Sequence, residues 1–222
     1  MARSVPYGIL QEMRQMKKVI TIGREFGSGG REIGRRIAEK LQIAYYDQEI
    51  VTEIAKRTQL SEEYVERITE DRPYMAYPVH AGMSFHTAYY AYTEFDRSLT
   101  VFAEQHNMIK ELAERSDCVI VGRCADYILK EKDPFRIFVY ADAESKLKRC
   151  RERSPEDENL SDSKIRRNIR SIDKGRARYY NYFSRQKWGA CENYDMLINT
   201  SGKDVGRVSE AVADYLKRYL FE

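Results

Sequence analysis

The stretch "ITIGREFGSGGREIG", residues 20–34, decides how the rest of the chain is interpreted. It begins as a short apolar run that ends in Gly23, which is typical of a buried parallel strand. Gly27, Gly29 and Gly30 follow, and after them apolar residues recur at helical spacing. A strand, a glycine-rich turn and a helix in this order point backbone N–H groups at one place, which suits a phosphate. The sequence therefore predicts an anion-binding loop here.

Two classes of nucleotide use such a loop, and the match to each motif is incomplete. A dinucleotide-binding loop has the pattern G-x-G-x-x-G, and Glu32 stands where the third glycine belongs. A nucleoside-triphosphate loop has the pattern G-x-x-x-x-G-K-[ST]. When this motif is anchored on Gly29, Arg24 replaces its first glycine, Gly30 its lysine and Arg31 its hydroxyl residue. From the residues alone, an oxidoreductase and a phosphoryl-transfer enzyme both stay open.

The composition sets the class of protein. The chain of 222 residues suits one substantial domain, residues 1–222, with a lid or an insertion. The net charge of +3 is too small for a surface that coats nucleic acid. No window approaches the roughly 18 apolar residues of a membrane span, and the four cysteines show no disulfide framework. We expect a cytoplasmic protein that binds no nucleic acid polymer and no membrane, and a homo-oligomer is compatible with these features.

Short apolar runs alternate with helical patterns along the chain, which predicts a parallel sheet with helices on both faces. The runs with the character of buried strands are 17–23, 43–47, 118–122, 135–141 and 194–200. The clearest helical patterns are 31–41, 96–115, 143–153, 163–186 and 204–220. Residues 1–17 form an N-terminal arm by this criterion. Residues 58–95 carry two prolines and many aromatic side chains, so we expect an inserted, mostly helical or loop subdomain on the substrate side.

Three segments resemble one known family, the cytidylate kinase-like family of P-loop nucleoside-monophosphate kinases. They are "ITIGREFGSGGREIGRRIAEKLQIAYYDQEIV" (20–51), "VIVGRCADYIL" (119–129) and "YYNYFSRQKWGACENYDMLINTS" (179–201). The resemblance implies a three-layer α/β P-loop nucleotide kinase fold, with a five-stranded parallel sheet, a monophosphate-binding insertion and an arginine-rich lid. It also implies that the γ-phosphoryl group of ATP, with Mg²⁺, is transferred to a nucleoside monophosphate, with CMP or dCMP as the first expectation.

Two departures from the cytidylate kinases affect catalysis directly. Gly30 stands where those enzymes have the lysine that bridges the β- and γ-phosphates, and Val121 stands where they have an acid that helps to hold magnesium. Removing one preorganised donor typically costs about 3–4 kcal/mol of transition-state stabilisation. Two alternatives therefore stay open: a catalytically weak or inactive nucleotide-binding regulator on this scaffold, and a kinase of another small metabolite.

Two arginines are candidates to compensate for the missing lysine. Arg31 lies one residue past the lysine position, and its long forked side chain can return to the phosphates. Arg24 could cover the loop from the other side. The residues predicted to bind the ATP phosphates are Arg24, Gly27, Ser28, Gly29, Gly30, Arg31 and Glu32.

The acceptor and the metal are expected at two strand ends. Asp47 and Arg123 each follow a predicted strand, and the carboxyl ends of parallel strands line a crevice. The resemblance implies that both residues contact the acceptor, and that Arg123 holds its phosphate. Asp47 and Glu32 are the candidate magnesium ligands because hard cations prefer carboxylates. In an oxidoreductase, Asp47 would instead hold a ribose.

The lid is expected at residues 154–178. Apolar residues define one face of the basic helix 163–186, and Arg176 falls on that face, where it either snorkels or reaches into a cleft. The segment "DKGRAR" (173–178) resembles the lid element of cytidylate kinases, which implies that Arg176 and Arg178 neutralise the transferring phosphoryl group. Together with Arg31 they are the catalytic candidates. Further charged candidates near the lid are Arg149, Arg153 and Asp173.

Overall fold

The computed structural model describes residues 17–70, 85–153 and 160–222, and for residues 85–92 it describes the backbone alone. The expected N-terminal arm and the middle of the expected insertion lie outside these ranges. The first part of the expected lid also lies outside them.

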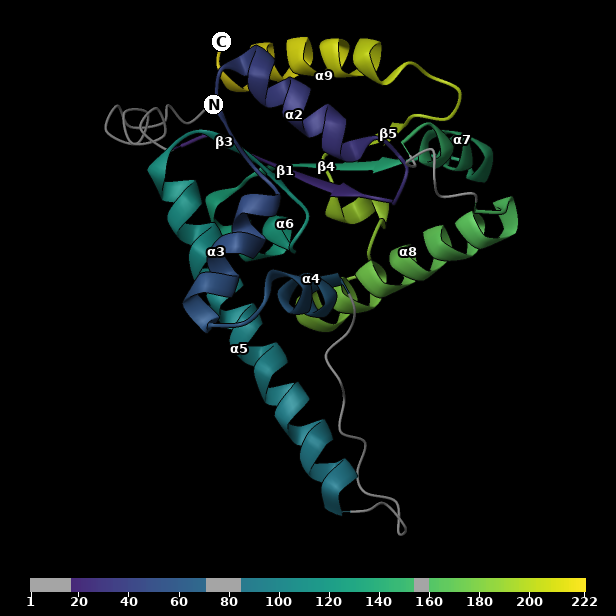
Figure 1. The fold of residues 1–222 in the computed structure, drawn as a ribbon. Helices are drawn as coiled ribbons and strands as arrows, with labels where there is room; N and C mark the ends of the chain where they lie inside the picture. Colours follow the sequence, from purple (N-terminus) through teal and green to yellow (C-terminus); the bar gives the residue numbers. More distant parts are fainter. Residues whose placement is uncertain (1–16, 71–84, 154–159) are drawn as a thin grey trace.

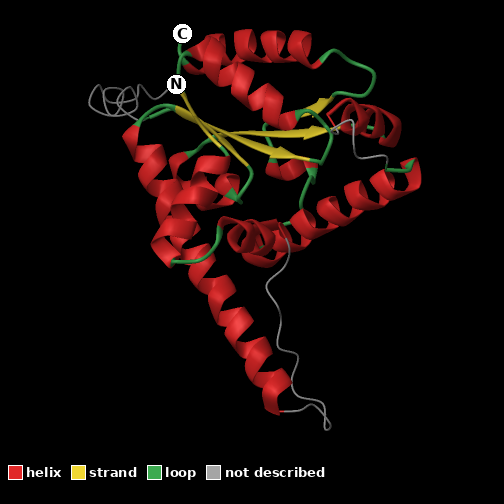
Figure 2. Ribbon diagram, viewed as in Figure 1, coloured by secondary structure: helices red, strands yellow, loops and turns green. Residues whose placement is uncertain are grey.

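A five-stranded sheet forms the centre of the molecule (Figures 1 and 2). Its strands run in the order β2-β3-β1-β4-β5, and every neighbouring pair is parallel. The strands are β1 (Val19–Arg24), β2 (Ala44–Tyr46), β3 (Cys118–Val121), β4 (Phe135–Tyr140) and β5 (Met196–Asn199). All five strands predicted from apolar runs are confirmed, and so is the three-layer α/β fold.

Helices cover both faces of the sheet (Figure 1). Helices α2 (Gly30–Leu41) and α9 (Val205–Leu220) pack together on one face. The other face is covered by α3 (Gln48–Thr58), α4 (Glu62–Glu70), α5 (Phe85–Arg115), α6 (Ala125–Ile128) and the end of α8 (Asp162–Ser184). Successive residues of β3 alternate between the two cores: Cys118 and Ile120 join the second, and Val119 and Val121 the first. Burying each such aliphatic side chain contributes about 1.5–3 kcal/mol, so both cores hold the sheet.

Helix α7 (Ala143–Arg153) and the start of α8 lie beside the carboxyl end of the sheet, where β1 leads into the glycine loop (Figure 1). A small separate apolar cluster joins them, formed by Leu147, Ile165 and Ile169 with the half-buried Phe26 of the loop packed against it. The contact between α8 and the loop is therefore independent of the two main cores. Two short 3₁₀ helices, Lys130–Lys132 and Cys191–Asn193, complete the described elements.

One helix is longer than the sequence pattern predicted. Helix α5 begins at Phe85, eleven residues before the expected start at Asp96, and its first half projects from the body of the molecule (Figure 1). These first residues belong to the aromatic-rich segment that was expected to be a helix or a loop, so the start of the helix was placed too late. Within the described ranges, no helix combines the length and apolar character that crossing a bilayer requires.

Candidate active site

The loop between β1 and α2 adopts a conformation that requires glycine at two positions. Gly27 and Gly29 have φ angles of +73° and +86°, a region that side chains rarely adopt. A Cβ at Gly29 would lie 2.9 Å from Val205 Cγ2. Ser28 closes the turn, because its hydroxyl donates its only proton to the Glu25 carbonyl oxygen at 2.8 Å. That hydroxyl therefore braces the loop itself.

The same loop presents unused backbone donors. In the described part of the chain, the N–H groups of Gly27, Gly29, Arg31 and Glu32 have no protein acceptor. They lie at the N-terminus of α2, where the helix dipole adds roughly half a positive charge. Four donors that converge at a positive helix end form an anion-binding cradle.

The lysine position of the motif has no room for a side chain. A Cβ at Gly30 would lie 2.5 Å from Arg24 Cβ and 3.3 Å from Val139 Cβ. The Arg24 side chain fills this space and continues past Gly122, where a Cβ would lie 1.6 Å from Arg24 Nη1. The guanidinium of Arg24 therefore points towards the end of β3, away from the centre of the loop.

A buried cluster of arginines lies at that strand end. Arg176 Nη2 is 2.9 Å from Glu70 Oε1, and Arg24 Nη2 is 3.7 Å from Asp47 Oδ1. Burial, followed by the charge of Arg176, lowers the pKa of Arg24 to about 9. Burial also opposes the charge of Glu70, but the guanidinium groups of Arg176 and Arg24 lower its pKa below the usual value. Three arginines, Arg24, Arg123 and Arg176, therefore face two carboxylates, so this largely buried cluster carries excess positive charge.

Within the described part of the chain, several buried atoms of this cluster have no hydrogen-bond partner. They are Arg24 Nη2, Asp47 Oδ1, Arg123 Nε and Arg123 Nη2. The side chain of Arg123 is 5% exposed, and burial lowers its pKa. A buried donor without an acceptor costs about 1–3 kcal/mol. The unpaired donors are therefore a structural reason to expect an oxyanion between Arg24 and Arg123.

The backbone that places Arg123 is strained. Gly122, Arg123 and Cys124 all have positive φ angles, of 74°, 58° and 55°. A left-handed conformation costs roughly 1–2 kcal/mol for a residue with a side chain. The fully buried Gln105 holds this turn by donating from Nε2 to the Arg123 carbonyl oxygen at 2.8 Å. Strain of this kind is characteristic of ligand-binding turns.

The two metal candidates differ in how well they fit a magnesium ion. Asp47 is buried, and in the described residues its Oδ1 accepts no hydrogen bond, although Arg24 Nη2 lies 3.7 Å away, while Oδ2 lies 2.6 Å from Arg31 Nε. Glu32 has no such oxygen, because Oε1 lies 3.0 Å from Arg36 Nε and Oε2 lies 2.6 Å from Arg153 Nη2. Magnesium in kinases needs one or two carboxylates beside phosphates and water. Asp47 fits that requirement and Glu32 does not. The described residues contain no group of three or more metal-ligating side chains.

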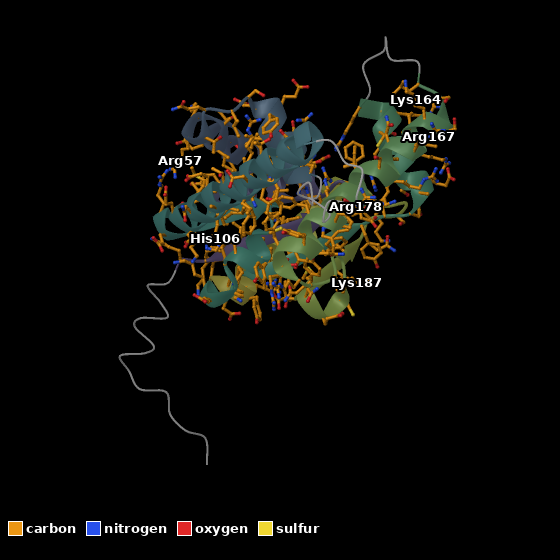
Figure 3. All side chains as sticks on the ribbon, turned by 90° about the horizontal axis from the view of Figure 1, so that it is seen from below. Arg57, His106, Lys164, Arg167, Arg178 and Lys187 are labelled. Carbon is orange, nitrogen blue, oxygen red and sulfur yellow. The ribbon has the colours of Figure 1, made fainter. Side chains whose placement is uncertain are left out.

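The two lid arginines face different surroundings. Arg176 pairs with Glu70, and its guanidinium lies 5.7 Å above the ring of Phe26, inside the site. Arg178 lies on the exposed side of α8, as do Lys164 and Arg167 (Figure 3). Two residues along a helix turn a side chain by more than half a circle, which explains the separation. The structure thus brings Arg176 to the arginine cluster and leaves Arg178 outside it.

Three hollows meet around the loop. The central one, of about 420 Å³, lies between the loop, α7 and α8. It shares Arg149 and Arg153 with a hollow of about 690 Å³ between α7, the start of α9 and α2. It shares Arg24 and Arg176 with a small hollow of about 30 Å³ at Arg123. The cradle of N–H groups therefore lies between a roomy end and a small, arginine-lined end.

Some contacts at the site could not be derived from the sequence pattern. Thr200 is fully buried, and its hydroxyl donates to the Ser28 carbonyl oxygen at 2.7 Å. Arg149 braces the same region by donating to the carbonyl oxygens of Gly27 and Thr200. Lys146 is buried beside the loop, although it reads as one more cation of a charged helix. Its spacing of four from Cys150, a half-buried residue, is the one pattern that could have placed it on the inner face.

The sheet order, the glycine loop and the converging donors define the class of the P-loop phosphotransferases. Residues 19–202 match the cytidylate kinase-like family, and the chain belongs to this family. Its class is that of the small-molecule kinases. No sequence among the curated proteins matches the chain.

Solved structures agree with this fold. An uncharacterised protein from Eubacterium ventriosum is 26% identical, with a TM-score of 0.65 over 90% of this chain and 99% of that one. Shikimate kinase from Bacteroides thetaiotaomicron is 17% identical, with a TM-score of 0.53 over 91% and 98%. Shikimate kinase from Acinetobacter baumannii in complex with shikimate is 15% identical, with a TM-score of 0.50 over 96% and 99%. At these identities the two kinases support the fold alone.

Proposed function

We propose that the protein transfers the γ-phosphoryl group of ATP to a nucleoside monophosphate, with CMP and dCMP as the first acceptors to test. Family membership supports the kinase chemistry. The observation that carries the acceptor side is the buried Arg123, whose Nε and Nη2 have no partner in the described structure. An acceptor phosphate would supply the missing acceptors through charge-assisted hydrogen bonds.

The loop and the hollows support a proposal for the donor side. The triphosphate lies along the N–H groups of the loop, and the roomier hollow near Arg149 takes the nucleoside. Asp47 Oδ1 would hold the magnesium ion, which neutralises charge between the β- and γ-phosphates when bound. Arg176 stands between the central hollow and the acceptor hollow, where it neutralises the group in transfer. Positioning and charge are sufficient for this reaction, so no general base is assigned.

One observation favours a second acceptor class. The hollow at Arg123, of about 30 Å³, accommodates an anionic group rather than a whole nucleotide. Arginine pairs bind carboxylates as readily as phosphates, and two of the structural neighbours are named shikimate kinases. A small hydroxylated carboxylate is therefore the second candidate acceptor.

The test is ADP release from ATP and magnesium, with CMP, dCMP, UMP, AMP and shikimate as separate acceptors. We expect turnover with one acceptor class, and an Arg123→Gln variant should lose about 10- to 100-fold in kcat/KM for it, because a hydrogen bond to a charged group contributes about 1.5–3 kcal/mol. Arg218→Gln removes an exposed guanidinium on α9 and is the matched control. Absence of turnover with every acceptor, while ATP still raises the melting temperature, would favour the regulatory alternative.

A further inference from the structure

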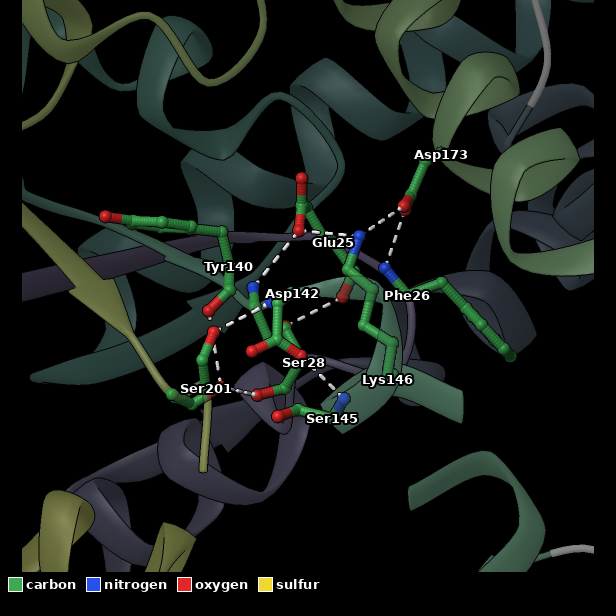
Figure 4. A network of polar contacts seen from close by, with 12 residues as sticks. Glu25, Phe26, Ser28, Tyr140, Asp142, Ser145, Lys146, Asp173 and Ser201 are labelled. Atoms are coloured by element: carbon green, nitrogen blue, oxygen red, sulfur yellow. Dashed lines mark hydrogen bonds and ion pairs between the residues drawn. The ribbon is translucent and has the colours of Figure 1, made fainter. Parts of the chain in front are cut away.

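Lys146 links three parts of the site (Figure 4). It belongs to α7, it is 7% exposed, and its Nζ lies 2.6 Å from Glu25 Oε2 and 2.9 Å from Asp173 Oδ2. The other oxygen of Asp173, Oδ1, accepts a hydrogen bond of 2.6 Å from the N–H of Phe26 in the loop. One carboxylate from α8 is therefore held by a loop amide and by an ammonium group.

These two donors are the kind that a phosphate oxygen requires. Backbone N–H groups and a lysine ammonium are the usual partners of the terminal phosphate in a nucleoside-triphosphate loop. Asp173 accepts a hydrogen bond from each of these donors, through Oδ1 from the Phe26 N–H and through Oδ2 from the Lys146 ammonium. An aspartate that bridges them shows that the pair already has the spacing to hold a small oxyanion.

We propose that the Phe26 N–H and the Lys146 ammonium together bind the γ-phosphate of ATP. Lys146 supplies, from α7, the positive charge that the loop lacks at Gly30. Asp173 is an internal competitor for the same donors, and ATP displaces it. This inference rests on the proposed function, since it concerns the donor side of that reaction.

The two arginines proposed from the sequence to replace the lysine are held by other parts of the site. Arg31 Nε lies 2.6 Å from Asp47 Oδ2, and its side chain is about half exposed. The guanidinium of Arg24 packs against Gly122 and lines the small hollow at Arg123. Lys146 differs from both, because its neighbouring carboxylate also contacts a loop amide.

The neighbouring carboxylates keep the Lys146 side chain positively charged. Burial opposes its charge, but the hydrogen-bonded carboxylates of Glu25 and Asp173 raise the pKa of Lys146 above its usual value. It is therefore protonated at neutral pH. When ATP displaces Asp173, a phosphate of higher charge takes that place, so the ammonium remains paired and Glu25 stays beside it.

The experiment measures ATP and ADP affinities by calorimetry on the full chain, each with magnesium. Lys146→Met should weaken ATP about 10- to 100-fold and ADP less than about 3-fold, because only ATP has a γ-phosphate and a charged hydrogen bond contributes about 1.5–3 kcal/mol. Lys146→Arg should recover part of the ATP affinity. Lys174→Met, an exposed lysine on α8, is the matched control and should change neither affinity.

The decisive variant is Asp173→Asn, because the two explanations predict opposite signs. If Asp173 competes with ATP, its loss tightens ATP by several-fold and leaves ADP nearly unchanged. If the three residues form a purely structural network, Asp173→Asn and Lys146→Met both weaken the two nucleotides together. Circular dichroism of each variant confirms that it is folded before titration.

The outcomes separate this inference from the proposed function. A wild-type chain that binds ATP and turns over an acceptor, together with a Lys146→Met variant whose ATP-to-ADP affinity ratio is unchanged, would refute the role of Lys146 alone. Weaker ATP binding in Asp173→Asn would also refute it. A wild-type chain that binds neither nucleotide would refute both.

Discussion

Restoring the missing lysine at position 30 should damage the protein rather than improve it. A Cβ there lies 2.5 Å from Arg24 Cβ, whereas carbon atoms pack best at about 3.5–4.0 Å. Arg24 is buried at the end of β1, so it cannot swing into solvent to make room. Overpacking of this kind costs about 1–3 kcal/mol, and alanine in a helix recovers at most about 1 kcal/mol relative to glycine. With the full recovery subtracted, up to about 2 kcal/mol of destabilisation remains, so we expect Gly30→Ala to lower the melting temperature by up to about 8 °C, since 1 kcal/mol corresponds to about 2–4 °C at this size.

Thermal unfolding followed by circular dichroism measures this effect, and Gly206→Ala is the control. Gly206 lies in the first turn of α9, where a Cβ would lie 3.1 Å from Asp204 Oδ1 and 3.6 Å from Arg36 Nη1, both of them side-chain ends rather than backbone. The control should therefore keep or raise the melting temperature. Gly30→Lys should be at least as destabilised as Gly30→Ala and should not gain turnover. A Gly30→Lys variant with the wild-type melting temperature and faster ADP release would refute this reasoning.

Three further changes have expected outcomes. Thr200→Val leaves the buried Ser28 carbonyl oxygen without its donor, so thermal unfolding should show a loss of about 1–3 kcal/mol. Arg31→Ala removes the ion pair of a half-exposed guanidinium with the buried Asp47, which keeps Arg24 Nη2 at 3.7 Å, so we expect less than about 1 kcal/mol of lost stability and less than about 5-fold weaker ATP binding by calorimetry. Neighbouring guanidinium groups hold the pKa of Glu70 below 4.5 despite its burial, so its stabilising effect is complete above that pH and is lost as the pH falls through the lowered pKa. The melting temperature of Glu70→Gln should therefore depend less on pH below 4.5 than that of the wild type.

The central sheet could be predicted because its strands are buried on both faces. Runs such as 118–122 and 135–141 are continuous apolar segments, and helical stripes separate them. The start of α5 could not be predicted in the same way. Its first residues, from Phe85 onward, lie in a half that projects from the body (Figure 1), and they belong to the aromatic-rich segment that was expected to be a helix or a loop. Apolar residues recur there at helical spacing, but the many tyrosines of the segment left the start of the helix ambiguous.

The strand-end residues of the site were predictable for a topological reason. Asp47 and Arg123 follow neighbouring parallel strands, so their side chains meet at one edge of the sheet. The pairing of Glu70 with Arg176 was not predictable, because 106 residues separate them and Glu70 reads as an ordinary surface charge. Lys146 was missed for the same reason. Its partners come from the loop and from α8, and a single helix pattern cannot reveal contacts with other elements.

The absence of the lysine is part of a packing arrangement, and this can be tested with a pair of substitutions. A simple loss of the lysine would leave free space at Gly30, yet Arg24 Cβ and Cγ occupy that space. The rest of the Arg24 side chain in turn requires a glycine at position 122. Arg24→Ala should cost stability on its own, and it should also reduce the penalty of Gly30→Ala. In a double-mutant cycle we expect a favourable coupling above about 1 kcal/mol, because the two positions are in contact. Additive effects in thermal unfolding would show that Gly30 and Arg24 contribute independently to stability. Packing against Arg24 would then not explain why the loop has no lysine at position 30.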